Sequence, residues 1–165
     1  MDTPTKLNSR TTLCFLIDNS HVLLAMKKRG FGVGKWNGTG GKIEEGESIE
    51  QAAVRETREE IGATPRLLEK VAVLTFHFAE EVAKLGKSEE CIVFICKQWD
   101  GEPIETEEMK PKWFEKTKLP FEIMWDDDPI WLPLVLKGEK VNGEFWFDRN
   151  FKMTDHNVKV VKNLL

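Results

Sequence analysis

The chain has 165 residues, enough for a sizeable hydrophobic core, and we expect a single domain over residues 1–165. Its 24 basic and 28 acidic residues give a formal net charge of −4, which excludes a general attraction to nucleic acid polymers or membrane surfaces. Any polyanionic ligand must therefore be bound by local cations or by a metal ion. The first ten residues contain no apolar signal-peptide core, and no apolar run approaches membrane-spanning length.

Three cysteines, Cys14, Cys91 and Cys96, lack the spacing of a metal site. Cys14 and Cys96 lie in apolar, strand-like runs, which favours buried thiols over a disulfide and therefore a reducing compartment. We expect a cytoplasmic protein, and the sequence is also compatible with nuclear or mitochondrial pools. We expect a monomer without a nucleic acid or membrane partner.

The first forty residues predict two strands followed by a loop. Residues 11–18 (TTLCFLID) and 21–28 (HVLLAMKK) are apolar strand-like runs, and the Asn19-Ser20 pair between them favours a hairpin. Residues 29–41 contain six glycines and predict a loop. Glycine-rich loops can cradle phosphates through backbone N–H groups, but composition alone is weak evidence for such a site.

Residues 41–63 predict a turn followed by a helix. Ser48 and Gln51 form a capping-box pattern, so the helix should begin at this point. Gly62 stands where a left-handed cap would end it.

Three glutamates of this helix, Glu56, Glu59 and Glu60, stand at i, i+3 and i+4, so their carboxylates share one face that overlaps the buried stripe. Like charges at this spacing destabilise a helix, and burial adds to the conflict. Divalent cations would resolve it, and Mg²⁺ is the usual ion when phosphates complete the coordination. Glu47 in the preceding turn can join from the side, and Arg55 can pair with Glu59. The alternative is a charged surface helix.

The rest of the chain predicts further strands and one helix. Strands are predicted at residues 67–80, 91–99, 109–115 and 151–161, a loop at 81–90, a tight turn at Asp100-Gly101 and a hairpin at Asn142-Gly143. Phe76 and Phe78 point to one side of their strand, as core or as a ligand-facing wall, and His77 points to the other side as a surface residue. Asp128 can cap a helix with Pro129 at its first position. These elements favour an α+β fold with a mixed sheet covered on both faces.

The stretch 41–63 matches the Nudix signature, G-x5-E-x7-R-E-U-x-E-E-x-G-U, in which U is a bulky aliphatic residue. The matching positions are Gly41, Glu47, Arg55, Glu56, Glu59, Glu60 and Gly62. Thr57 and Ala63 depart from the signature at two U positions, which are packing positions. The chain thus resembles Nudix hydrolases, and the resemblance implies a Nudix fold of the α+β class, an α/β/α sandwich with a mixed β-sheet.

Outside the signature, MKKRGFGVGKWNGTGGK, EEMKPKWF and MWDDDPIWLPLVL resemble the eukaryotic MutT-homologue branch of the family, the oxidised purine nucleoside triphosphatases. The resemblance implies a nucleotide pocket formed by Thr12, Lys27, Phe31, Asn37, Phe76, Phe78, Trp125, Asp127 and Asp128. It implies catalytic carboxylates at Glu56, Glu59, Glu60 and Glu108. Metal ligation would come from the same four glutamates and Gly41, with Mg²⁺ as the cofactor and Mn²⁺ as a substitute. The family has proline where this chain has Asp126.

The pocket residues also have suitable chemistry by themselves. Trp125 offers a flat surface on which a purine can stack, for a gain of ~1–3 kcal/mol per base. Asn37 carries a donor and an acceptor, as a purine edge does. Two adjacent aspartates in an apolar pocket cannot easily both ionise, so one can keep a proton and act as a donor. The alternative for Asp126 to Asp128 is an acidic turn that caps a helix.

These features predict Mg²⁺-dependent hydrolysis of oxidised purine (deoxy)nucleoside triphosphates, such as 8-oxo-dGTP and 2-oxo-dATP, to the monophosphate and pyrophosphate. By resemblance, the enzyme would remove damaged nucleotides before a polymerase uses them. The general base stays open among Glu59, Glu108 and a metal-bound hydroxide. The alternatives are a Nudix hydrolase of methylated purine nucleotides or dinucleoside polyphosphates, and a Nudix-fold binding module without turnover. The intact glutamate set argues against the binding module.

Overall fold

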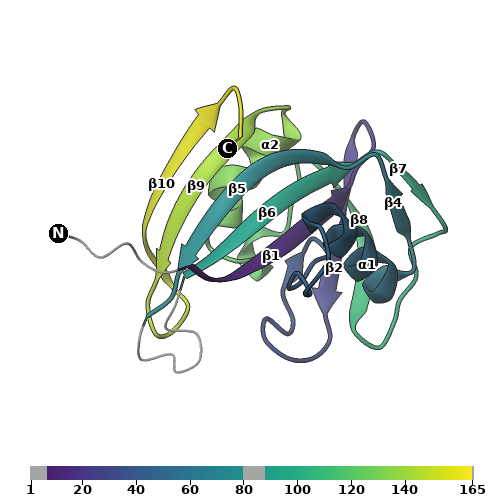
Figure 1. The fold of residues 1–165 in the computed structure, drawn as a ribbon, viewed down its shortest axis with the longest axis horizontal. Coiled ribbons are helices and arrows are strands. Elements are labelled where there is room, and N and C mark those ends of the chain that lie inside the picture. Colours follow the sequence, from purple (N-terminus) through teal and green to yellow (C-terminus); the bar gives the residue numbers. More distant parts are fainter. Residues whose placement is uncertain (1–6, 80–87, 165) are drawn as a thin grey trace.

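A five-stranded mixed sheet forms the centre of the protein in the computed structural model, which describes residues 7–79 and 88–164 (Figure 1). The elements in chain order are β1 (Leu7–Leu16), β2 (His21–Lys27), β3 (Trp36–Asn37), α1 (Ile49–Ile61), β4 (Thr64–Arg66), β5 (Glu69–His77), β6 (Ser88–Cys96), β7 (Gln98–Asp100), β8 (Met109–Glu115), the 3-10 helix η2 (Phe121–Ile123), α2 (Asp128–Leu136), β9 (Lys140–Phe147) and β10 (Met153–Val161). The central sheet has the order β1-β6-β5-β9-β10. Its β1–β6 and β5–β9 pairs are parallel and its other pairs are antiparallel, which confirms the predicted mixed sheet.

Two smaller antiparallel sheets complete the described strands. One has the order β3-β2-β8, and the other pairs β4 with β7. The predicted strand at 109–115 is confirmed as β8, and Pro111 is tolerated there because β8 is an outer strand of its sheet. The loop predicted at 81–90 lies mostly outside the described residues, and its last three residues belong to β6.

Both faces of the central sheet are buried. Alternate residues of β6 fall into two hydrophobic clusters, Cys91, Val93 and Ile95 in the first and Ile92, Phe94 and Cys96 in the second. The first cluster contains Trp131 of α2, and the second contains Ala53 of α1. A strand covered on both faces reads as a continuous apolar run, which explains the composition of β6. The helices therefore cover opposite faces, as the predicted α/β/α sandwich requires, and all three cysteines are buried free thiols.

The hairpin predicted from the first two strands is wrong. Between the two predicted strands there is one antiparallel bridge, from Ile17 just after β1 to Val22 of β2. It lies next to a turn in which the Asp18 N–H donates to the His21 carbonyl at 3.0 Å. Beyond that bridge, β1 pairs with β6 and β2 pairs with β3 and β8. Local sequence predicted the strands and the turn, but the pairing partners come from residues far along the chain.

The hairpin predicted at Asn142-Gly143 is also wrong, because both residues lie inside the continuous strand β9. Gly143 is required by close packing, since a Cβ there would lie 2.8 Å from a ring carbon of Phe145. The chain turns instead after β9, where the Asp148 carboxylate accepts the N–H groups of Asn150 at 2.8 Å and Lys152 at 3.0 Å. The predicted strand at 151–161 is confirmed as β10, the partner of β9.

The helix ends predicted from the sequence are confirmed at α1, whereas the predicted start of α2 is one residue late. Both hydrogen bonds of the capping box between Ser48 and Gln51 are present, and Gly62 ends α1 in the left-handed conformation with φ 74°. The cap of α2 is Asp127, one residue earlier than predicted, and its side chain makes no capping bond. The Asp128 carboxylate does not cap the helix either, because it accepts the backbone N–H of Trp125 at 3.2 Å.

Neither helix of the described segments is long and apolar enough to cross a membrane.

Candidate active site

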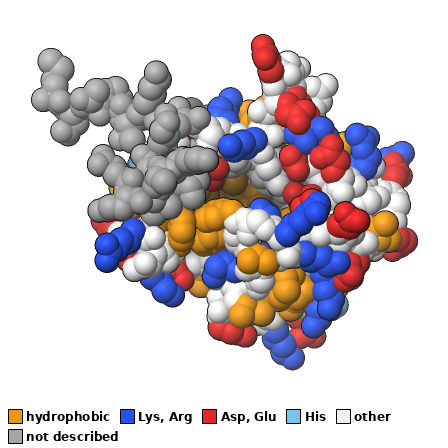
Figure 2. All heavy atoms as spheres, turned by 90° about the horizontal axis from the view of Figure 1, so that it is seen from below, with side chains coloured by type: hydrophobic (Ala, Val, Ile, Leu, Met, Phe, Trp, Pro, Cys, Tyr) orange, Lys and Arg blue, Asp and Glu red, His pale blue; other side chains and the backbone are white. Residues whose placement is uncertain are grey.

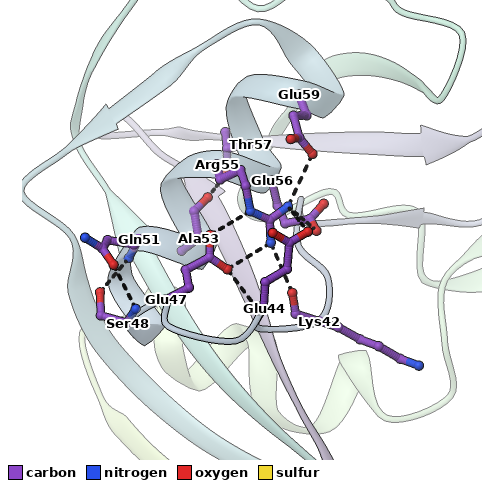
Figure 3. Close-up of polar contacts among 10 residues, drawn as sticks. All are labelled: Lys42, Glu44, Glu47, Ser48, Gln51, Ala53, Arg55, Glu56, Thr57 and Glu59. Carbon is purple, nitrogen blue, oxygen red and sulfur yellow. Dashed lines mark hydrogen bonds and ion pairs between the residues drawn. The ribbon is translucent and has the colours of Figure 1, made fainter.

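Arg55 is the centre of a network of carboxylates beside α1 (Figure 3). Its guanidinium donates to both oxygens of Glu47, at 2.6 Å from Nε and 3.0 Å from Nη2, and to the Lys42 carbonyl at 3.1 Å. Nη1 donates to Glu56 at 2.9 Å and to Glu59 at 3.3 Å, which confirms the expected pair with Glu59. The bidentate bond raises the pKa of Arg55 and lowers the pKa of Glu47. Contrary to expectation, Glu47 is therefore engaged in orienting Arg55 rather than turned towards a metal position.

The three helix glutamates do not share one environment, contrary to the sequence expectation. Glu60 is buried, whereas the Glu56 side chain is 17% exposed and the Glu59 side chain is 59% exposed. Helix geometry explains the difference, because Glu59 lies about 100° from Glu60 around the axis, away from the buried stripe. Burial and the neighbouring Glu56 raise the pKa of Glu60 to about 8, while the Gly40 N–H donates to Glu60 at 3.3 Å.

The glycine-rich loop packs directly against this helix. A Cβ at Gly41 would lie 2.5 Å from Oε1 of Glu56, so any other residue there would displace the Glu56 carboxylate from its position. Thr57, which stands at an aliphatic position of the signature, is fully buried and donates to the Ala53 carbonyl at 2.8 Å. The Thr57 hydroxyl also lies 2.6 Å from the Thr39 hydroxyl of the loop. The departure from the signature therefore replaces an apolar contact with a hydrogen bond between helix and loop.

Glu108 pairs with Arg29. The Arg29 Nε donates to it at 2.9 Å, and Nη2 donates to the same oxygen. This bond lowers the pKa of Glu108, with a smaller contribution from Lys27. Lys27 also partly offsets the burial that raises the pKa of Glu60. Lys27 is thus within the electrostatic reach of both Glu60 and Glu108.

The predicted metal ligands are only partly brought together. Within residues 7–79 and 88–164, no three His, Cys, Asp or Glu side chains form a group arranged to hold a metal ion. Glu59 and Glu108 are each bonded to an arginine through one carboxylate oxygen and are partly exposed.

The donors near the glycine-rich loop nevertheless fit a divalent cation. Glu56 and Glu60 are close enough for the charge of one to raise the pKa of the other, in a position that water screens poorly. The Gly41 carbonyl accepts the Thr12 N–H at 2.9 Å and has a second lone pair available. Hard cations such as Mg²⁺ prefer oxygen donors of this kind, and a bound cation would remove the repulsion between the carboxylates.

A cavity of about 240 Å³ lies between the central sheet, the glycine-rich loop and the start of α2. All nine residues predicted to bind nucleotide line it: Thr12, Lys27, Phe31, Asn37, Phe76, Phe78, Trp125, Asp127 and Asp128. Its lining extends to Gly40 and Gly41, beside Glu56. On the face seen from below, hydrophobic side chains gather beside a hollow (Figure 2). The structure therefore brings together residues from six separate segments, and their binding roles stay predictions.

Thr12 presents an unsatisfied polar group at this cavity. Its side chain is 2% exposed, and its Oγ1 is the one buried side-chain nitrogen or oxygen without a hydrogen-bond partner among the residues that the structure describes. Leaving such a group unpaired costs about 1–3 kcal/mol. A ligand that hydrogen-bonds to Thr12 would remove this cost, so the hydroxyl favours occupation of the cavity by a polar molecule.

Asp127 and Asp128 are buried side by side in the cavity wall. Asp127 accepts the indole N–H of Trp131 at 2.8 Å, and Asp128 accepts the Trp125 N–H. Burial raises the pKa of Asp127 to about 6. Burial and the adjacent Asp127 raise the pKa of Asp128 well above its usual range. The pair therefore favours one neutral and one ionised carboxyl near neutral pH, so together the two groups can offer a donor and acceptors.

Asp126 does not belong to the cavity. Its carboxylate accepts the Met153 N–H at 3.1 Å and so ties the loop before α2 to the first residue of β10. Asp127 and Asp128 line the cavity, and Asp126 does not. The solvated acidic turn considered from sequence is excluded for Asp127 and Asp128, whose side chains are 3% and 2% exposed.

Aromatic rings form much of the remaining wall. Phe31 lies 5.2 Å from Trp125 between ring centroids, and the Lys35 ammonium lies 5.2 Å from the Trp125 ring centre. Phe76 and Phe78 each lie near Phe147, with centroids 6.1 Å and 5.8 Å away. Phe76 of β5 and Phe78 just after it thus line the cavity and also pack against the core.

Sequence reasoning missed several lining residues, among them Lys35, Glu89, Cys91, Trp131 and Phe147. Strand alternation could have found two of them, because Glu89 of β6 pairs with Phe76 and Cys91 lies two residues further on the same face. His77 faces away, as expected, but it is half-buried rather than a surface residue. Its ring nitrogens lie 2.6 Å from the Ser88 hydroxyl and 2.8 Å from the Glu144 carboxylate.

Comparison with known proteins shows the family of the chain. The model of the NUDIX domain matches residues 7–135, which is more than half of the chain. The chain belongs to the NUDIX family. The predicted Nudix fold is thereby confirmed, and the helix α1 with its flanking loop is the Nudix signature element.

Individual relatives cover nearly the whole chain. It is 42% identical over 153 residues to the oxidized purine nucleoside triphosphate hydrolase of Danio rerio, with 93% of this chain and 96% of the relative covered. It is 40% identical to the protein of the same name from Mus musculus, with 91% and 94% covered. Among solved structures it is similar to the mutator MutT protein from Bacillus halodurans, with a TM-score of 0.79, 28% identity, and 92% and 97% of the chains covered. These matches confirm the resemblance to the MutT-homologue branch.

Proposed function

We propose that this Nudix protein hydrolyses oxidised purine (deoxy)nucleoside triphosphates, such as 8-oxo-dGTP and 2-oxo-dATP, to the monophosphate and pyrophosphate. The observation that carries the proposal is a single cavity that joins Trp125 and the buried aspartate pair to Gly41, which touches Glu56. A nucleoside triphosphate would match both ends of this cavity. Its base is aromatic and carries hydrogen-bond donors and acceptors, and its triphosphate is a polyanion. The names of the zebrafish and mouse relatives support this substrate class.

The base would occupy the aromatic end of the cavity. Trp125 and Phe31 offer ring faces for stacking, and the aspartate pair offers a donor and acceptors to the base edge. Asn37 lines the same cavity, and its amide can donate and accept at once. Oxidation of a purine changes which ring positions donate, so a wall of adjustable donors suits modified bases. The unpaired Thr12 hydroxyl would bond the nucleotide as well.

The triphosphate would lie towards Lys27, Gly40 and Gly41. The Lys27 ammonium can meet phosphate oxygens as a point charge. Glu56 and Glu60 would hold divalent metal, which Nudix hydrolases generally use, and we propose Mg²⁺ with Mn²⁺ as a substitute. When bound, such an ion neutralises phosphate charge, activates water and stabilises the leaving group. The bonds from Arg55 keep the Glu56 carboxylate oriented towards the glycine-rich loop.

Glu59 and Glu108 have a secondary place in this proposal. Both are partly exposed and keep lone pairs beyond those bonded to arginine, so each could join the metal site or accept a proton. The biological role would be to remove oxidised nucleotides from the precursor pool, in a cytoplasmic single-domain protein that acts as a monomer on a small-molecule substrate.

The test is pyrophosphate release from a panel of nucleotides, with Mg²⁺, with Mn²⁺ and with EDTA. The panel contains 8-oxo-dGTP, 2-oxo-dATP, dGTP, dATP, a methylated purine triphosphate and a dinucleoside polyphosphate. We expect metal-dependent turnover with the highest kcat/KM for the oxidised purines. A preference for methylated or dinucleoside substrates would replace the proposed substrate class, and tight binding without pyrophosphate release would identify a binding module.

Two matched variants of α1 test whether Glu56 takes part in the reaction. Glu56→Gln should lower kcat by about 100-fold or more, as the loss of a catalytic electrostatic group does. Glu50→Gln is the control, because Glu50 is an exposed glutamate in the first turn of the same helix. Equal activities of the two variants would remove Glu56 from the reaction.

A further inference from the structure

Phe151 adopts a backbone conformation that bulky residues avoid. Its φ is 59°, in the left-handed region that favours glycine, and among non-glycine residues of the described segments only Leu67 shares a positive φ. For an aromatic residue this conformation is strained and persists only where the surroundings enforce it. Such strain is concentrated at functional sites, so the contacts of Phe151 need an explanation.

The turn between β9 and β10 enforces this conformation. The Phe151 N–H donates to the Asp148 carbonyl at 3.0 Å, and the Asp148 N–H donates to the Lys152 carbonyl at 2.8 Å. The Asp148 carboxylate accepts two further N–H groups of the same turn. On the far side, the bond from Met153 to Asp126 ties the turn to the loop before α2. The turn is thus closed by its own bonds and anchored to the segment that carries Trp125.

The half-buried Phe151 ring meets three rings of the proposed base pocket. It packs edge-to-face on Phe31 with centroids 5.1 Å apart, on Trp125 at 6.2 Å and on Phe78 at 6.2 Å. These three residues come from the glycine-rich loop, the loop before α2 and the segment just after β5, and all three line the cavity. Phe151 is absent from the lining itself. It therefore stands behind the lining rings and links elements that are far apart in sequence.

We propose that Phe151 is a positioning residue that fixes the stacking wall of the base pocket, and that it acts on binding of the base without acting on the reacting phosphates. The inference rests on the proposed function. Phe31 has two aromatic neighbours, Trp125 and Phe151, and is 48% exposed. Removal of the Phe151 ring would leave Trp125 as its one remaining aromatic neighbour. Phe31 and Trp125 would then sample other orientations, and part of the stacking free energy would be spent on ordering them.

Two substitutions separate the ring from the strained backbone. Phe151→Gly removes the ring and relieves the positive φ, whereas Phe151→Ala removes the ring and keeps the strain. Phe151→Tyr keeps the ring and should rescue. Leu67→Gly is the matched control, since Leu67 has φ 52°, is 78% exposed and does not line the cavity.

The readouts are KM and kcat for 8-oxo-dGTP, the dissociation constant of 8-oxo-dGMP by calorimetry, and inhibition by inorganic tripolyphosphate, which has no base. We expect Phe151→Gly and Phe151→Ala to raise KM and the 8-oxo-dGMP dissociation constant about 3- to 10-fold, as the loss of aromatic pairs does. Their kcat and their tripolyphosphate inhibition constants should stay within about 2-fold of wild type. Leu67→Gly and Phe151→Tyr should behave as wild type, and Phe151→Gly should melt at or above Phe151→Ala.

Each opposite result has a distinct meaning. Unchanged binding of 8-oxo-dGMP in both ring-deleted variants overturns the positioning role, even if turnover by the wild type is normal. An equal loss of nucleotide and tripolyphosphate binding also overturns it, because that result shows a general disturbance of the site. If the wild type binds 8-oxo-dGMP more tightly than the ring-deleted variants but releases no pyrophosphate, the proposed hydrolysis is refuted. The positioning role of Phe151 in base binding is then still supported.

Discussion

Glu60 is a buried residue whose charge conflicts with its surroundings. Its pKa in the folded protein is about 8 against an ordinary 4.5, because of burial and Glu56. A raised carboxyl pKa means that the folded state favours the protonated form. Stability of the metal-free protein should therefore be highest below pH 4.5 as far as this group is concerned, and it should fall as the pH rises from 4.5 to 8.

Glu60→Gln removes this pH dependence. In EDTA at pH 8 we expect the variant to be more stable than wild type by on the order of 2–4 kcal/mol, since one pKa unit corresponds to about 1.4 kcal/mol. At pH 4 the two proteins should be equally stable. Urea unfolding across this range measures the difference, with the exposed Glu59→Gln as the control. A variant less stable than wild type at pH 8 would show that the ionised carboxylate is well satisfied in the fold.

The buried aspartate pair makes a second prediction at the residue scale. Asp127→Asn keeps the acceptor for the Trp131 N–H but fixes one member of the pair as neutral. The ratio of kcat/KM for 8-oxo-dGTP and 2-oxo-dATP should therefore change, and its variation with pH near 6 should disappear. Metal dependence should be unaltered. Kinetics of both substrates from pH 5 to 9 provide the test, and an unmoved ratio would mean that Asp127 does not read the base.

At the scale of elements, α1 and the glycine-rich loop form one unit. The loop approaches the helix at Gly41, and a buried hydrogen bond between the hydroxyls of Thr39 and Thr57 joins the loop to the helix. Arg55 closes the outer side by binding the Lys42 carbonyl together with the carboxylates of the turn and helix. The position of Glu56 therefore depends on contacts along both sides of the helix.

Thr57→Val tests the hydrogen bond between the hydroxyls of Thr57 and Thr39. Valine has the same shape and restores the aliphatic character of the signature, but it leaves the Thr39 hydroxyl with only a 3.3 Å bond to the Cys14 carbonyl. We expect a loss of about 1 kcal/mol in unfolding free energy and a moderate fall in kcat. The double variant with Thr39→Val should recover stability, because neither hydroxyl then stays unpaired. Additive losses in a double-mutant cycle would show that the two hydroxyls do not interact.

At the scale of the whole molecule, the central sheet holds the two ends of the site at a fixed distance. β1 carries Thr12 at the cavity and β5 carries Phe76. α2 begins at Asp128 and covers the opposite face of the sheet from α1. A nucleotide and a metal ion would thus bind to different elements of one rigid frame, and each should stabilise the folded state.

Thermal unfolding with Mg²⁺ and 8-oxo-dGMP measures this linkage. At 100 times its dissociation constant, a ligand adds about 2.7 kcal/mol, which corresponds to a rise in Tm of roughly 5–10 °C for a chain of this size. Trp125→Ala should lose most of the shift caused by the nucleotide and keep the shift caused by Mg²⁺. If the variant lost both shifts, Trp125 would be a structural residue whose removal disturbs the whole frame.

The sequence by itself determined the helix α1, its caps and the Nudix signature, because these depend on contacts within a few residues. Ser48, Gln51 and Gly62 act locally, and so does the spacing of the glutamates. Resemblance supplied nine positions expected to bind nucleotide, and all of them line one cavity. Tertiary structure decided how the strands pair, because strand pairing depends on residues that are distant in sequence. Gly143, for example, lies within β9 and does not form the predicted turn.

Tertiary structure also decided which carboxylates are buried. Spacing alone placed Glu59 and Glu60 on one face, yet only Glu60 lies against the protein. Three consecutive aspartates look alike in sequence, but Asp126 binds β10 while its two neighbours face the cavity. Charge state and accessibility depend on what packs around a side chain, and that environment is assembled from segments that only the folded chain brings together.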